Sequence, residues 1–220
     1  MQIEIYSDTI CPWCLIGKRR LERALEEQPQ PDLKIVWRAF QLNPAMPAEG
    51  MDRQHYLELK FGGAERAATV YEPIKQAGLT EGIDFAFDKM QRTPNTLNSH
   101  RLLRFAQNKG QAFGEAVLEN LFRSYFFNGG DIGDLEILAD LAEESGLDRA
   151  EVADYLASDA DRESVAAEDA RAREIGIQGV PTYILDGHYV LSGAHPPEVL
   201  FRLFDLVKGD QKVEEAPQES

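Results

Sequence analysis

The chain has 220 residues, of which 43% are hydrophobic and 28% charged, a composition typical of a globular protein that excludes a disordered or fibrous chain. Asp and Glu number 38 against 23 Lys and Arg, so the formal net charge is −15. An acidic surface of this kind repels phosphate groups, so neither nucleic acid nor a membrane is an expected partner. No apolar run approaches the roughly 18 residues needed to span a bilayer, and the N-terminus has no secretion signal. We therefore expect a cytoplasmic protein.

The first 40 residues predict a strand, a helix and a second strand. Polar and apolar residues alternate over 2–7, as they do in a strand, whereas apolar residues recur at helical spacing over 12–27. Residues 33–40 again favour a strand. The spacing is typical of a β-α-β unit with parallel strands.

The middle of the chain predicts helices and no strand. Glycines separate the helical patterns, which cover residues 52–61, 64–77, 96–109, 111–127, 134–145, 148–157 and 160–175. Strand character returns at 182–185 and, after an Asp-Gly turn signal, at 188–191. A helix at 197–208 completes the pattern.

This order of elements predicts an α/β protein with a thioredoxin-like fold and a large all-helical insertion domain. The thioredoxin-like domain is expected to be discontinuous, with residues 1–45 and 176–210 on either side of an insertion domain of residues 46–175. Residues 211–220 are polar and acidic, and we expect them to form a disordered tail. A fold does not assign a function, so the function has to be argued from a site.

Both cysteines of the chain, Cys11 and Cys14, fall in one Cys-x-x-Cys motif between the first strand and the first helix. A thiolate at the start of a helix faces free N–H groups and the positive end of the helix dipole, which stabilise the anion. Pro12 fits the first helical turn, where its missing N–H is not needed. We expect Cys11 to attack a substrate disulfide and Cys14, one turn further along, to resolve the mixed disulfide.

Two other interpretations of the motif are weaker. A structural disulfide across so small a loop would stabilise the fold little. A zinc site needs two more ligands, and the histidines lack the usual spacing, so no metal is expected.

Trp13, between the cysteines, is either an exposed contact for substrates or a cover against the insertion. Asp8 is expected to be a loop or capping residue, and His100 contributes only if its helix covers Cys11.

Gly179-Val180-Pro181 precedes the returning strand and is the second notable motif. A proline at the first position of a strand is compatible with an ordinary trans bond. In thioredoxin-like folds, however, this proline is cis and lies against the Cys-x-x-Cys motif. A cis bond would direct the backbone of Val180 toward Cys11, where an extended substrate could pair with it. We expect the cis form.

The chain resembles the DsbA-like thioredoxin family, and within it the FrnE-like cytosolic branch. The matching stretches run in order along nearly the whole chain, at residues 7–25, 94–106, 124–134, 176–185 and 192–198. The resemblance implies thiol–disulfide oxidoreductase activity, with Cys11 as nucleophile, Cys14 as resolving thiol and Pro181 as the cis-proline.

The expected substrate contacts are Pro12, Trp13 and Val180. The expected partner is a disulfide-containing protein or a small thiol, with no bound cofactor and with glutathione left open as a co-substrate. The related 2-hydroxychromene-2-carboxylate isomerases and kappa-class glutathione transferases bind glutathione but carry a serine at the position of Cys11. A glutathione-dependent isomerase or transferase is therefore the alternative, and a holdase-like binding module is a third hypothesis. No pattern indicates the oligomeric state.

Overall fold

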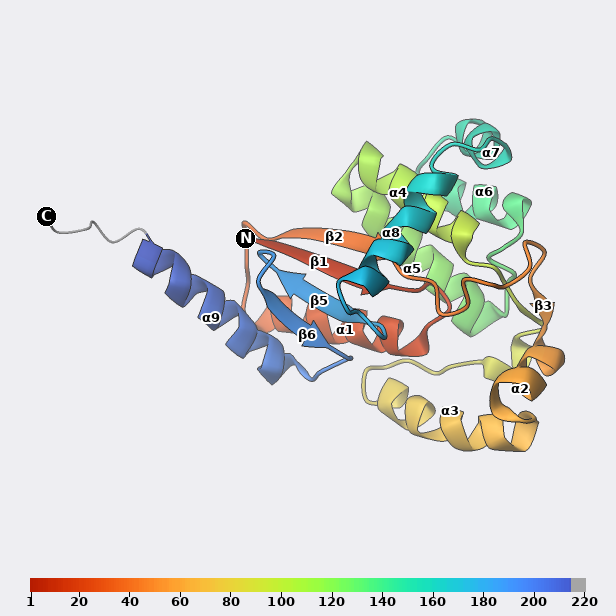
Figure 1. Cartoon of the computed structure of the whole chain (residues 1–220), viewed down its shortest axis with the longest axis horizontal. Helices are drawn as coiled ribbons and strands as arrows, with labels where there is room; N and C mark the ends of the chain where they lie inside the picture. Colours follow the sequence, from red (N-terminus) through yellow and green to blue (C-terminus); the bar gives the residue numbers. More distant parts are fainter. Residues whose placement is uncertain (215–220) are drawn as a thin grey trace, which may run out of the picture.

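A four-stranded mixed sheet forms the centre of the computed structural model, which describes the backbone of residues 1–214 and the side chains of residues 1–209 (Figure 1). The strand order is β2-β1-β5-β6; β1 is parallel to β2 and antiparallel to β5, and β5 and β6 form an antiparallel hairpin. The strands are β1 Gln2–Ser7, β2 Lys34–Ala39, β5 Thr182–Leu185 and β6 Tyr189–Ser192. The expected thioredoxin-like α/β fold is confirmed.

Alternation along β1 decides which helix covers each face of the sheet. Ile3 and Ile5 point to one face, where they join the core shared with helix α1, Pro12–Glu27. Tyr6 points to the other face and packs against Ala172 of helix α8, Arg162–Glu174, in a second apolar cluster. Helix α1 begins and ends at the predicted residues, and it crosses back along the sheet so that the chain can enter β2 parallel to β1.

The segment between β2 and β5 is helical, as expected, but it is not all-helical. The short strand β3, Met51–Asp52, pairs with β4, Arg92–Thr93, and a 3-10 helix η1, Phe87–Lys89, precedes β4. Strands of this length are too short to carry an alternating pattern in the sequence. Besides α8, the helices of this segment are α2 Arg53–Phe61, α3 Ala64–Leu79, α4 Leu97–Lys109, α5 Gln111–Asn128, α6 Leu135–Glu144 and α7 Arg149–Ala157.

One contiguous core runs through the sheet and the inserted helices. Ile5 of β1, Leu102 of α4 and Leu200 of the last helix, α9 (Pro197–Glu214), are all fully or almost fully buried in it. The insertion therefore packs as an extension of the thioredoxin-like part, and the boundaries of the two predicted domains stay a prediction.

Two acidic residues of the inserted segment attach it to α1. Glu119 of α5 pairs with Lys18 and Arg19, and Glu81, after α3, pairs with Arg20 over 2.7 Å. Burial raises the pKa of Glu119, but hydrogen bonds from Arg19 and Lys18 outweigh this and lower it to about 2. Helix α1, which carries the cysteines, is thus held against both α5 and the end of α3.

The last helix, α9, Pro197–Glu214, extends past its predicted end at 208. Residues 211–214, expected to belong to a disordered tail, are therefore helical, and residues 215–220 of that expected tail lie outside the described residues. Gly209 costs a helix about 1 kcal/mol relative to alanine. The apolar face of α9 packs beside α1 and outweighs that cost, through Leu200, Leu203, Phe204 and Val207.

Candidate active site

Cys11 is the N-cap residue of α1. Its backbone is extended, with φ −91° and ψ 114°, and Pro12 follows in the first turn. The Cys11 N–H donates to the Asp8 carbonyl over 3.0 Å, and the Cys11 carbonyl accepts from the Cys14 N–H over 3.0 Å. The first turn holds neither a side-chain cap nor an acidic residue. The positive end of the helix dipole is therefore left for an anion at Cys11, as the sequence predicts.

The two cysteines are free and lie 3.5 Å apart. Cys11 is 4% exposed and Cys14 1%, so both are buried and Cys11 is slightly the more accessible. Burial raises the pKa of Cys14 well above its ordinary value, and the neighbouring Cys11 adds to the rise. The Ser7 side chain and the Asp8 backbone N–H act in the opposite direction. Cys14 is therefore a protonated thiol at neutral pH.

The Val180–Pro181 peptide bond is cis, in agreement with the prediction. The Cys11 thiol lies 3.6 Å from the Val180 carbonyl oxygen, so this turn faces the Cys11 sulfur. The Thr182 hydroxyl donates to the Gly179 carbonyl over 2.8 Å and closes the turn from within. The fold thus brings the Gly179-Val180-Pro181 motif and the cysteine motif together, although they lie near opposite ends of the chain.

Gly17 allows α1 to approach this turn closely. A Cβ atom at Gly17 would lie 2.4 Å from the Tyr183 hydroxyl oxygen and 3.0 Å from Pro181 Cγ. Tyr183 is 1% exposed, and its burial raises the pKa of the phenol, so the ring is a neutral, fixed neighbour. The glycine is required by the packing of α1 on β5, a need that our sequence analysis missed.

The inserted helix α3 flanks the cysteine turn. It contacts α1, and its Tyr71 belongs to the apolar surroundings of the core that contains Cys11. Burial raises the pKa of Tyr71, and the charge of Cys11 contributes, which places the phenol within electrostatic reach of the thiol. Trp13 keeps 36% of its surface exposed and is not covered by the insertion.

A buried pair of Asp8 and His100 lies beneath the turn. Asp8 Oδ1 and His100 Nε2 are 3.3 Å apart, and Asp8 Oδ2 accepts from the Leu42 N–H over 2.7 Å. This agrees with the structural role expected for Asp8, but α4 brings His100 to the back of the turn. No local pattern links the two, since they come from separate elements. Among the described residues, no group of three or more His, Cys, Asp or Glu is placed to hold a metal ion.

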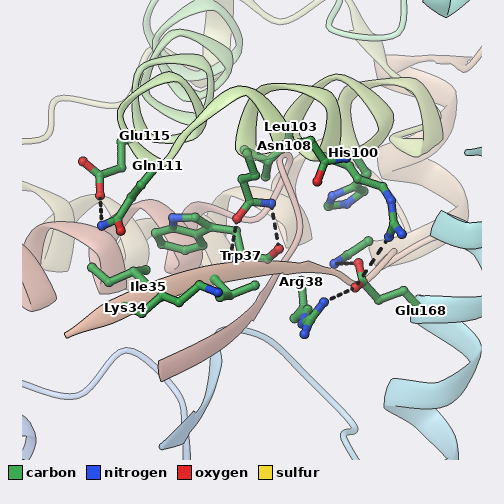
Figure 2. A pocket seen from close by; sticks show the side chains of 14 residues that line it. Lys34, Ile35, Trp37, Arg38, His100, Leu103, Asn108, Gln111, Glu115 and Glu168 are labelled. Carbon is green, nitrogen blue, oxygen red and sulfur yellow. Dashed lines mark hydrogen bonds and ion pairs between the residues drawn. The ribbon is translucent and has the colours of Figure 1, made fainter. Parts of the chain in front are cut away.

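A cavity of about 260 Å³ lies between β2 and α4, away from the cysteines. Figure 2 shows Trp37 of β2, His100 of α4 and Glu168 of α8 around it. The Gln107 amide accepts from the Trp37 N–H and donates to the Trp37 carbonyl, over 2.8 and 3.0 Å. Glu168 accepts from the Ala39 N–H over 2.8 Å. Neither cysteine lines this cavity, so we do not assign it to thiol chemistry.

Comparison with known proteins agrees with this geometry. The family model described as a DSBA-like thioredoxin domain matches residues 2–204. The crystal structure of a probable DsbA oxidoreductase from Streptomyces coelicolor is 32% identical, with a TM-score of 0.86, over 100% of this chain and 93% of that chain.

More distant structures share the fold. A 2-hydroxychromene-2-carboxylate isomerase is 19% identical, with a TM-score of 0.67, over 99% of this chain and 100% of the other. The cytosolic disulfide reductase DsbM of Pseudomonas aeruginosa, solved with GSH, is 18% identical, with a TM-score of 0.67, over 94% and 100%. At these identities the likeness concerns the fold alone. The family match over nearly the whole chain establishes that the protein belongs to the DSBA-like thioredoxin domain family, whose members are generally disulfide oxidoreductases.

Proposed function

We propose that the protein is a thiol–disulfide oxidoreductase that acts through Cys11 and Cys14. The observation that carries the proposal is the pair of free cysteines, 3.5 Å apart, at the uncapped start of α1. The cis Val180–Pro181 turn supports it, because its carbonyl lies against the Cys11 thiol.

In the proposed reaction, the Cys11 thiolate attacks one sulfur of a substrate disulfide. That S–S bond breaks, one substrate sulfur leaves as a thiolate, and the other stays bound to Cys11. Cys14 then loses its proton and attacks Cys11, forming the Cys11–Cys14 disulfide and releasing the second substrate thiolate, which takes up the proton. The substrate gains two electrons, and a small thiol such as glutathione returns two electrons to the pair in the next cycle.

Substrate is proposed to bind across Val180, Pro12 and Trp13. An extended segment that carries the disulfide would pair with the backbone at Val180, as an added strand does. The exposed part of Trp13 would contact its apolar side chains. Proteins and small disulfides both satisfy this arrangement, and disulfide isomerisation needs no further group.

A glutathione-dependent isomerase or transferase is the second candidate. It is supported by the fold likeness to the 2-hydroxychromene-2-carboxylate isomerase and to the reductase solved with GSH. Cys11 argues against it, since serine is expected at this position in those enzymes.

In the described part of the chain no helix is both long and apolar enough to cross a membrane. A cytoplasmic location remains our proposal.

The first test is turnover of insulin disulfides with a dithiol reductant. We expect Cys11→Ser to lose the catalysed rate, and Cys14→Ser to accumulate a mixed disulfide that mass spectrometry locates on Cys11. The two variants change the same type of side chain and so control for each other. Equal rates for wild type and Cys11→Ser would overturn the proposal. Glutathione-dependent turnover of 2-hydroxychromene-2-carboxylate that survives Cys14→Ser would instead establish the second candidate.

A further inference from the structure

Ser7 carries a buried hydroxyl that is left without a partner. It is the last residue of β1 and is 2% exposed. Its Oγ atom has no hydrogen-bond partner among the residues that the structure describes. Buried hydroxyls are nearly always paired, so an unpaired one calls for a physical reason.

The alternation of β1 points this hydroxyl at the helix that carries the cysteines. Ser7 shares its face of the strand with Ile3 and Ile5, which pack into the core beneath α1. Cys14 lies on the buried face of α1, and the Ser7 side chain is close enough to its sulfur to lower the pKa of the thiol. The two side chains therefore meet across the interface between strand and helix.

The contact explains why the hydroxyl is unpaired. A neutral thiol is a weak hydrogen-bond acceptor, so it does not satisfy the hydroxyl while Cys14 is protonated. A thiolate is a strong acceptor. Ser7 and the Asp8 N–H both lower the pKa of Cys14 against the effect of burial, as donors to its anion must. The acceptor that Ser7 lacks is thus formed during the reaction.

We propose that Ser7 is a catalytic residue of the resolution step, in which its hydroxyl and the Asp8 N–H donate hydrogen bonds to the Cys14 sulfur as it becomes a thiolate. This rests on the proposed oxidoreductase function. The Cys14 thiolate attacks Cys11 in the mixed disulfide, the bond from Cys11 to the substrate breaks, and the Cys11–Cys14 bond forms. The departing substrate thiolate takes up the proton that Cys14 lost. Donors held in place before the charge develops lower the barrier of such a step.

The role of Ser7 is restricted to the second half of the reaction. The first attack uses Cys11, whose sulfur lies by the Val180 carbonyl and the start of α1. Removal of the Ser7 hydroxyl should leave that attack unchanged. A general structural role would instead slow both halves together.

The experiment mixes the reduced protein with an aromatic disulfide that releases a coloured thiolate. Attack by Cys11 releases the first thiolate and resolution by Cys14 releases the second, so Cys14→Ser defines the first phase alone. For Ser7→Ala we expect an unchanged first phase and a second phase slowed about tenfold or more, the typical effect of a lost hydrogen bond to a charged group. The pH profile of the second phase should move to higher pH.

Matched variants separate the hydroxyl from the shape of the side chain. Ser7→Thr keeps the hydroxyl and should resolve like wild type, whereas the similarly shaped Ser7→Val should resolve like Ser7→Ala. Thr9→Ala removes a nearby buried hydroxyl that is already paired with Ser99, over 2.7 Å, and should leave the second phase unchanged. The unpaired hydroxyl of Ser7 contributes no hydrogen bond, so Ser7→Ala should unfold at the temperature of wild type.

A second phase at the wild-type rate in Ser7→Ala and Ser7→Val would overturn the role of Ser7. Equal slowing in Thr9→Ala, or in Ser7→Thr, would do the same. If Cys11→Ser still shows the first phase, the proposed oxidoreductase function itself is wrong. If Cys11→Ser is inactive and the Ser7 variants react normally, only the inference about Ser7 fails.

Discussion

Substitution of Gly17 by alanine should destabilise the protein and disturb the cysteine turn. Alanine is the better helix former by about 1 kcal/mol, so propensity alone predicts stabilisation. The new Cβ, however, would lie 2.4 Å from the Tyr183 hydroxyl oxygen and 3.0 Å from Pro181 Cγ. Favourable non-bonded contacts need about 3.5–4.0 Å, and overpacking of this kind costs about 1–3 kcal/mol. Because Tyr183 and Pro181 are buried rings that cannot swing away, we expect the overpacking to outweigh the gain in helix propensity, with a net loss of up to about 2 kcal/mol.

Urea unfolding measures this loss, and insulin reduction measures its effect on the Pro181 turn. Gly209→Ala in α9 is the control, because nothing lies within 4 Å of its Cβ, so only the helix-propensity gain remains. The double variant Gly17→Ala with Tyr183→Phe should recover part of the loss, since the closest contact is removed. If Gly17→Ala is as stable as wild type, or gains stability as Gly209→Ala does, close approach is not the reason for the glycine.

Three further predictions concern buried polar groups. Arg101 is fully buried and donates hydrogen bonds to backbone carbonyls at and just after the end of α7. Arg101→Met should therefore lower the free energy of unfolding, measured in urea, by at least about 3 kcal/mol. An unchanged free energy of unfolding would contradict this. The pKa of Glu119 is about 2 when folded and 4.5 ordinarily, so its stabilising effect is complete above pH 4.5 and is lost as the pH falls toward 2. In Glu119→Gln the free energy of unfolding should depend less steeply on pH over that interval. An identical slope in the variant and the wild type would show that the ion pairs of Glu119 do not cause the pH dependence. Asp8→Ala leaves the Leu42 N–H without its acceptor and should cost about 1–3 kcal/mol in urea unfolding, with alkylation of Cys11 unchanged; an unchanged free energy of unfolding would show that this hydrogen bond contributes little.

Local patterns predicted the elements on either side of the cysteine motif. Strand alternation and helical spacing placed β1 and α1 at their observed bounds, and Pro12 marked the start of the helix. The same alternation also places Ser7 on the α1 face with Ile3 and Ile5, so this residue could have been found from the sequence. Ser7 is the last residue of the strand, and the alternation applies to it as it does to Ile3 and Ile5.

Contacts between distant elements were not predictable in this way. The pairing of Asp8 with His100 depends on how α4 packs against the turn, and nothing near either residue encodes that choice. The pairing of β3 with β4 involves two residues from each strand, and two residues are too few to show an alternating pattern in the sequence. The extension of α9 to Glu214 likewise follows from its packing on α1, which overrides the local cost of a glycine.

The paired backbone of β2 bears on how copies of the protein can assemble. Gln107 occupies both the N–H and the carbonyl of Trp37, and Glu168 occupies the N–H of Ala39. A strand from another molecule would have to displace both side chains before it could lengthen the sheet on this side. Growth of the sheet from one molecule into the next is therefore hindered at β2, where these two side chains already hold backbone groups of Trp37 and Ala39.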